Sequence, residues 1–67
     1  MTKKRPTPFD DAAYAEGRTA KERGLSYQSC PYFFDKLGVT QEQFERDYRA
    51  KMNGWTYGWI EANEEKR

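Results

Sequence analysis

The sequence contains no histidine and only one cysteine, Cys30. One cysteine excludes an internal disulfide, and the lack of histidine removes the usual zinc-binding sets and the commonest general base. No apolar run approaches the roughly 20 residues of a membrane span, and none follows the basic start of the chain as in a signal peptide. We therefore expect a cytoplasmic protein that has no membrane association and no cofactor.

Catalytic motifs are also lacking. The sequence has neither a phosphate-binding glycine loop nor a nucleophile with a partner base, which indicates that the protein is not an enzyme. Cys30 is the only candidate nucleophile, because a helical turn opening at Pro31 would lower the pKa of its thiol. The alternative interpretation of Cys30 is a small buried apolar residue at a tight corner.

The chain is short and nearly neutral. It has 67 residues, and 12 basic side chains against 11 acidic ones leave a net charge of +1. This length allows one small domain, and the 16% of aromatic residues must supply most of its buried area. We expect a flexible basic arm over residues 1–8, a helical domain over residues 9–63 and a charged tail over residues 64–67.

The first helix is predicted over residues 10–23. Asp10 is a good N-cap, and Phe9 and Tyr14 have the spacing of a hydrophobic staple. Gly24 is placed to end the helix. Small residues follow one face of this helix and predict a groove into which bulky groups pack closely; they are Ala13, Gly17, Ala20 and Gly24.

A second helix is predicted over residues 40–63. Thr40 and Gln43 have the spacing of a capping box. Asn53-Gly54 is a turn signal, but we favour an unbroken helix because the apolar stripe keeps its phase across this pair. The stripe consists of Phe44, Tyr48, Met52, Trp55, Trp59 and Ala62, and the face expected in solvent carries Glu45, Arg46, Arg49, Glu61 and Glu64.

The segment between the helices contains Cys30-Pro31-Tyr32. Pro31 disfavours the α conformation at Cys30, and a short helical turn is predicted over residues 31–37, closed by Gly38. We infer an all-α fold of two antiparallel helices, with the rings of the second, Trp59 among them, packed into the groove of the first. Rings left exposed at Phe33, Phe34 and Tyr57 would allow a homodimer.

The charge is divided unevenly along the chain. Residues 1–25 carry six basic and four acidic groups, whereas residues 33–67 carry six basic and seven acidic groups. A basic arm beside a basic helix edge can bind RNA phosphates, and tyrosines can stack on unpaired bases, although a solubilising tail explains the arm equally well. The candidate RNA-binding residues are Lys3, Lys4, Arg5, Arg18, Lys21, Arg23 and Tyr32.

Two short motifs resemble bacterial ribosome modulation factor and its small relatives. The first is Ala13-x3-Gly17-x2-Ala20-x3-Gly24-x5-Cys30-Pro31-Tyr32, and the second is Trp55-x2-Gly58-Trp59-Ile60-Glu61-Ala62. The resemblance implies a two-helix fold and a ribosome-hibernation function, in which the protein binds small-subunit ribosomal RNA and regulates translation. It also implies mainly structural roles for the motif residues Gly17, Gly24, Cys30, Pro31, Tyr32, Trp55, Gly58 and Trp59.

The stretch between the two motifs leads to an alternative hypothesis. Residues 33–54 form a longer segment than in that family and carry four acidic side chains: Asp35, Glu42, Glu45 and Asp47. A shared fold does not require a shared target. The alternative is therefore a phage- or plasmid-encoded inhibitor that binds a host protein.

Overall fold

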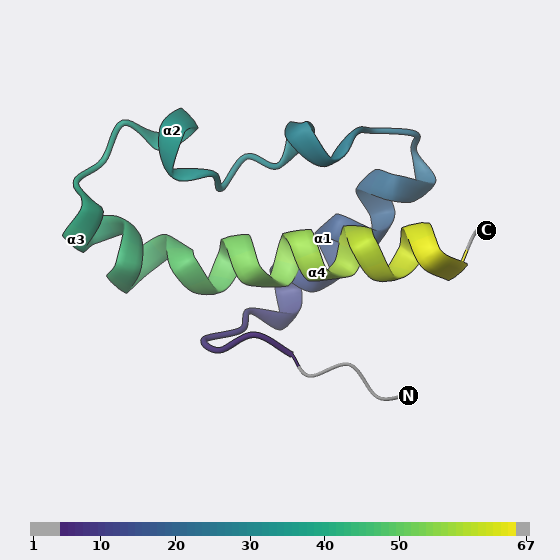
Figure 1. The fold of residues 1–67 in the computed structure, drawn as a ribbon, viewed down its shortest axis with the longest axis horizontal. Helices are drawn as coiled ribbons and strands as arrows, with labels where there is room; N and C mark the ends of the chain where they lie inside the picture. Colours follow the sequence, from purple (N-terminus) through teal and green to yellow (C-terminus); the bar gives the residue numbers. More distant parts are fainter. Residues whose placement is uncertain (1–4, 66–67) are drawn as a thin grey trace.

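The computed structural model describes residues 5–65, which form helices and loops without a β-strand (Figure 1). This confirms the predicted all-α class. The α-helices are α1 (Asp11–Glu22), α2 (Phe34–Leu37), α3 (Gln41–Gln43) and α4 (Arg49–Glu65). A 3-10 helix, η1 (Tyr27–Ser29), precedes α2, and a π-helix, η2 (Phe44–Tyr48), joins α3 to α4.

Helix α1 begins as its sequence predicts. The Asp10 side chain accepts a hydrogen bond from the backbone N–H of Ala13 at 3.1 Å, which satisfies one of the free donors of the first turn. The rings of Phe9 and Tyr14 lie 5.7 Å apart between centroids and close the predicted staple. The start of α1 is therefore determined by residues within five positions of one another.

The end of α1 is a Schellman motif centred on Gly24. The N–H groups of Gly24 and Leu25 donate to the carbonyls of Lys21 and Ala20, each at 3.0 Å. Gly24 has a φ of 82°, a left-handed conformation that glycine adopts without a steric cost. A Cβ at Gly24 would meet no atom within 4 Å, so this residue caps α1 and takes no part in the predicted groove.

The second helix is longer than predicted. Thr40 accepts a hydrogen bond from the backbone N–H of Gln43 at 3.1 Å, which confirms it as the cap. Helices α3, η2 and α4 then follow one another without a break, through Asn53-Gly54, to residue 65. The predicted continuity is confirmed, the π turn of η2 was not predicted, and residues 66–67 of the expected tail lie outside the described residues.

The two long helices run in the same direction, so the predicted antiparallel arrangement is wrong. At the start of α1 the N–H of Asp10 donates to the carbonyl of Ala50 at 3.1 Å. Further along, Arg18 reaches Glu61 and Glu65 near the end of α4. The reason is the connector, residues 23–40, which is long enough to return along α4 before the second helix begins (Figure 1).

The connector follows its prediction in part. Cys30 has φ −55° and ψ 122°, outside the α region, as expected before a proline. The helical turn begins at Phe34 instead of Pro31, because Phe33 has extended backbone with φ −71° and ψ 139°. Gly38, with φ 66°, closes the turn as predicted.

Helices α1 and α4 cross with their main chains in contact. A Cβ added at Gly17 would overlap the carbonyl oxygen of Trp55, and one at Gly58 would overlap the carbonyl oxygen of Tyr14. Gly54 faces the carbonyl of Asp10 in the same way. The close approach predicted at Gly17 is confirmed, but the group that approaches it is backbone and not an aromatic ring.

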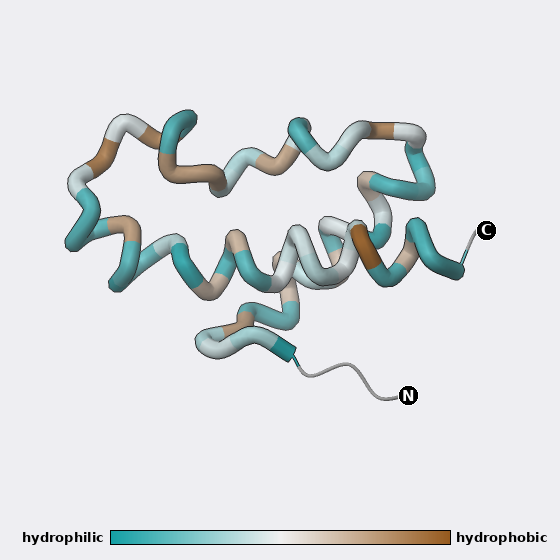
Figure 2. Tube along the Cα trace, viewed as in Figure 1, coloured by the Kyte–Doolittle hydropathy of each residue, from teal (hydrophilic) through white to brown (hydrophobic). Residues whose placement is uncertain are grey.

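The core lies beside this crossing and is centred on Trp55. Its ring, 3% exposed, packs with Cys30 and the small α1 residues Ala13 and Ala20. Trp59 is only half-buried: its Nε1–H donates to the carbonyl of Leu25 at 2.8 Å. Trp59 packs against this core without filling it, and the ring at the centre of the core is that of Trp55, one helical turn earlier on α4. Along the rest of the chain, hydrophilic residues are common and hydrophobic ones are scattered among them (Figure 2).

Candidate binding site

The predicted basic residues lie in different surroundings. Lys3 and Lys4 are outside the described residues. Arg5 is exposed at the start of α1, where its guanidinium carbon lies 4.7 Å from the centroid of the Phe9 ring and its Nη1 lies 3.6 Å from Asp11. Arg5 thus stays in reach of an external anion.

Arg18 is held in a cluster with α4. Its Nη1 donates to Glu61 at 2.7 Å, its Nη2 donates to Glu65 at 2.5 Å, and the Tyr14 hydroxyl also donates to Glu61. The side chain of Arg18 is 28% exposed. The cluster compensates its charge within the molecule, and it corrects the expectation that Glu61 lies on a solvated face.

This cluster shifts the pKa values of Glu65, Tyr14 and Arg18. The hydrogen bonds from Arg18 lower the pKa of Glu65 below its ordinary value. The hydrogen bond to Glu61 raises the pKa of Tyr14, so its hydroxyl remains a donor. The Arg18 guanidinium has its pKa raised, chiefly by Glu65. The ion pairs therefore form at neutral pH and join α1 to the end of α4.

Lys21 and Arg23 differ in what they contact. The Lys21 ammonium lies over the Trp59 ring, 5.0 Å from its centroid, and Lys21 as a whole is half-buried. Arg23 is exposed, and its guanidinium has no ion-pair partner among residues 5–65. Neither Lys21 nor Arg23 forms an ion pair among residues 5–65, and Arg23, at the C-cap of α1, is the exposed one of the two.

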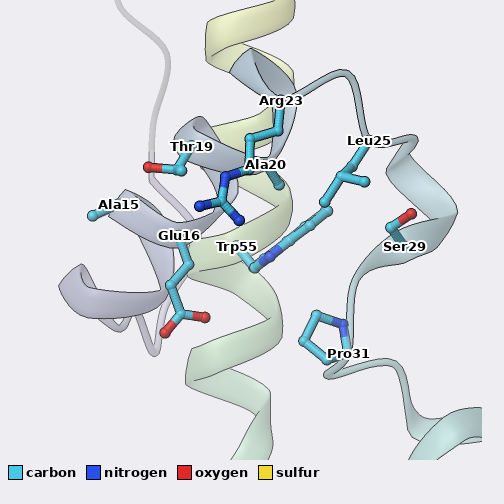
Figure 3. A pocket seen from close by; sticks show the side chains of 9 residues that line it. All are labelled: Ala15, Glu16, Thr19, Ala20, Arg23, Leu25, Ser29, Pro31 and Trp55. Carbon is cyan, nitrogen blue, oxygen red and sulfur yellow. The ribbon is translucent and has the colours of Figure 1, made fainter.

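Arg23 lines a groove of about 480 Å³ between α1 and the connector (Figure 3). The ring of Trp55 extends beneath the groove, toward the connector. Most of the lining is apolar, with charged side chains contributed by α1. The lining residues are Ala15, Glu16, Thr19, Ala20, Arg23, Leu25, Ser29, Pro31 and Trp55.

Tyr32 holds the second charged residue of the groove in place. Its hydroxyl donates to Oε1 of Glu16 at 2.9 Å. Burial, together with the hydrogen bond and charge of Glu16, raises the pKa of Tyr32 to about 12, so the hydroxyl keeps its proton at neutral pH. The predicted RNA-binding residue Tyr32 therefore positions the carboxylate of Glu16.

Of the two interpretations of Cys30, a reactive nucleophile or a small buried apolar residue, the structure supports the second. It is fully buried in the core, at 0% exposure. Burial raises the pKa of its thiol, opposite to the shift that a reactive cysteine needs. The helical turn that was expected to lower this pKa begins three residues later than Pro31, at Phe34.

The motif residues gather around the crossing. Gly17 and Gly58 form the backbone contact, Cys30 and Trp55 form the core, and Tyr32 and Trp59 pack against that core. The sequence interpretation missed Glu16, Thr19 and Ser29 as lining residues. Part of the signal was present, since Glu16, Thr19 and Arg23 recur at intervals of three and four and so share a face of α1.

Comparisons with family models, with curated proteins and with solved structures return no match. Within residues 5–65, no group of three or more cysteine, aspartate or glutamate side chains is placed to hold a metal ion. None of the helices described there has the length and apolarity needed to cross a membrane. The groove and the exposed basic residues are thus the features from which a function can be argued.

Proposed function

We propose that the protein binds small-subunit ribosomal RNA in the cytoplasm and regulates translation, as the ribosome modulation factor family that it resembles does. The observation that carries this proposal is the free, exposed guanidinium of Arg23 beside a groove at the C-terminal end of α1. Arg5 supplies a second exposed guanidinium before α1, next to Lys3 and Lys4 in the sequence. Arginine binds phosphate in a bidentate fashion, which suits RNA.

Two further features support the proposal. Most of the motif residues on which the resemblance depends pack at or beside one crossing, in keeping with the mainly structural role that the family implies, whereas Gly24 caps α1 and Pro31 is exposed. The guanidinium of Arg18, in contrast, donates its hydrogen bonds to Glu61 and Glu65. Fewer basic side chains are therefore available to contact RNA than the sequence suggested. With a net charge of +1 and few phosphate contacts, we expect weak binding that decreases further as the salt concentration rises.

Cosedimentation with purified small ribosomal subunits tests this proposal. We expect the protein in the ribosomal fractions at low salt and less of it at physiological salt. Arg23→Ala is expected to reduce the bound fraction several-fold more than Arg46→Ala, which removes an equal charge from η2, where Arg46 pairs with Asp47. Absence of the protein from ribosomal fractions at both salt levels would overturn the proposal.

A second candidate is a protein-binding inhibitor of a host protein. It is favoured by three exposed apolar side chains, Leu25 at 45%, Phe34 at 41% and Ile60 at 39%. Its test is a pull-down in which a stoichiometric partner survives nuclease treatment and high salt, and is lost on Leu25→Ser or Ile60→Ser. Loss of every partner on nuclease treatment would contradict it.

A homodimer remains the third partner prediction. Of the rings expected to form its interface, Phe33 packs against Tyr27 and Tyr57 against Phe9, with centroids 5.6 and 5.7 Å apart. Phe34 is the exposed one of the three, although its ring also lies 5.4 Å from Phe44. Sedimentation equilibrium of the wild type and of Phe34→Ser tests this prediction, which a monomer at all concentrations would contradict.

A further inference from the structure

The groove carries opposite charges on one wall. Glu16 lies on α1 and Arg23 is its C-cap residue, seven positions later, so their Cα atoms are about 10 Å apart along a helix that rises 1.5 Å per residue. Apolar side chains lie between them, with Trp55 beneath and Pro31 on the connector (Figure 3). A volume of about 480 Å³ falls within the range of small-ligand sites, about 300–1,000 Å³.

The Arg23 end favours a phosphate. A guanidinium offers a planar fork of N–H donors and no acceptor, and its charge at Arg23 is not compensated by an ion pair within residues 5–65. Thr19 and Ser29 also line the groove, but their hydroxyl groups point away from the Arg23 guanidinium, so Arg23 supplies the phosphate donors at this end (Figure 3).

The Glu16 end favours a group with adjacent hydrogen-bond donors. A carboxylate accepts hydrogen bonds only, and the Tyr32 hydroxyl occupies just one of its acceptor positions. Among the RNA bases, guanine presents two neighbouring donors, N1–H and the N2 amino group, on its Watson–Crick edge. The other bases place an acceptor beside each donor on that edge, which a carboxylate repels.

We propose that this groove binds one guanosine nucleotide of single-stranded RNA. Arg23 contacts the phosphate, the base lies against the exposed apolar side chains of Leu25 and Pro31, above the buried ring of Trp55, and Glu16 accepts from the guanine edge. Tyr32 is a positioning residue for Glu16. The span of a purine nucleotide from phosphate to Watson–Crick edge is comparable with the rise of about 10 Å between the Cα atoms of Glu16 and Arg23. This inference rests on the proposed RNA-binding function and adds a base preference to it.

Fluorescence anisotropy of labelled single-stranded RNA tests the preference. Three pentanucleotides are compared, with guanosine, adenosine or uridine at the centre of a uridine background. We expect about tenfold tighter binding of the guanosine oligonucleotide, the lower part of the range for a bidentate contact to a base edge. In NMR spectra, the indole resonance of Trp55 is expected to shift on binding, whereas that of Trp59, outside the groove lining, serves as an internal reference.

Matched variants separate the two ends of the groove. Glu16→Gln is expected to abolish the guanosine preference, because an amide no longer offers two acceptors, while affinity for the adenosine oligonucleotide stays the same or rises. Glu22→Gln removes the same charge from an exposed position of α1 that does not line the groove, and it should preserve the preference. Arg23→Ala is expected to weaken binding of all three oligonucleotides equally. Tyr32→Phe should reduce the preference without removing the carboxylate.

The outcomes distinguish this inference from the proposed function. Equal affinity for the three oligonucleotides, or a preference that survives Glu16→Gln with circular dichroism unchanged, overturns the guanosine site alone if the protein still cosediments with small subunits. No binding to any oligonucleotide, together with absence from ribosomal fractions, overturns both. Guanosine preference lost in Glu16→Gln and kept in Glu22→Gln supports the site.

Discussion

Gly17, Gly54 and Gly58 determine how closely α1 and α4 approach. Each of these glycines faces a backbone atom of the opposite helix at a distance that leaves no room for a Cβ. A glycine inside a helix costs about 1 kcal/mol relative to alanine, because it gives up more backbone freedom on folding. At these positions the cost is offset by main-chain contact that a larger residue would prevent.

Gly58→Ala is therefore expected to destabilise the fold by about 1–3 kcal/mol through overpacking, although alanine is the better helix former. The obstructing atoms are the backbone of Tyr14 and Arg18, which cannot rotate away as a side chain does. Urea unfolding of the variant measures this change. Ala12→Gly, at an exposed position of α1, is the control for propensity and should cost about 1 kcal/mol. An increase in stability for Gly58→Ala would contradict the backbone contact.

The two tryptophans are expected to differ in their contribution to stability. Trp55→Ala should cost about 3–5 kcal/mol, because it opens a cavity beside Cys30 in the core. Trp59→Ala should cost distinctly less, since Trp59 is half-buried and loses a hydrogen bond to Leu25 together with its contact to Tyr27. Thermal unfolding of both variants measures the difference. Equal losses would show that the core extends to Trp59.

At the scale of the elements, the caps could be predicted from sequence and the pairing of the helices could not. Asp10, Thr40 and Gly24 act on atoms within five residues along the chain, so local patterns suffice to find them. The ion pairs of Arg18 join residues 43 and 47 positions apart, and their formation depends on the direction in which α4 passes α1. The antiparallel prediction placed α4 in the opposite direction.

The pairing of α1 with the end of α4 makes stability depend on pH. Arg18 lowers the pKa of Glu65 in the folded state relative to the unfolded chain. A lowered folded-state pKa contributes stability that is fully present above the unfolded value, about 4.3 for glutamate, and that is lost as the pH falls through the folded value. We expect the midpoint of thermal unfolding to fall below about pH 4.5 and to fall less steeply in Glu65→Gln. Identical profiles for the two proteins would contradict the ion pair.

At the scale of the whole molecule, the connector decides the arrangement. Residues 23–40 run back along α4 and past the start of α1, which lies beside Ala50, so the second helix begins beyond α1 and runs in the same direction (Figure 1). The short 3-10 helix η1 and the turn α2 occupy this return path. Composition and periodicity identified both long helices. The connector has no strong periodicity, so the sequence pattern does not indicate the direction in which it runs.

Distance measurements between spin labels test this direction. Labels at Glu22 and Glu64 are expected to lie closer together than labels at Ala12 and Glu64, because α1 approaches the end of α4 with its own C-terminal end. Antiparallel helices would give the reverse order. Ala12, Glu22 and Glu64 are exposed, and Cys30 is buried and does not take up the label under native conditions.

The candidate site was predicted less completely than the fold. Arg23 and Tyr32 were singled out for charge and for aromatic character, and both belong to the groove or to its positioning contacts. Glu16 was not singled out, because an acidic residue on a helix has no distinguishing sequence pattern. Its role depends on the contact with Tyr32, which lies 16 positions away in the sequence. The groove also depends on the buried Trp55, which comes from α4 and is brought beside α1 and the connector only in the folded chain.

The backbone contact between α1 and α4 limits which residues of this fold can change during evolution. The approach of α1 to α4 depends on the absence of side chains at Gly17, Gly54 and Gly58 and not on the identity of the residues outside the contact. Substitutions on the outer faces therefore leave the crossing unchanged. A lineage with this fold is free to exchange its surface charges, and with them its target, while the three glycines stay fixed.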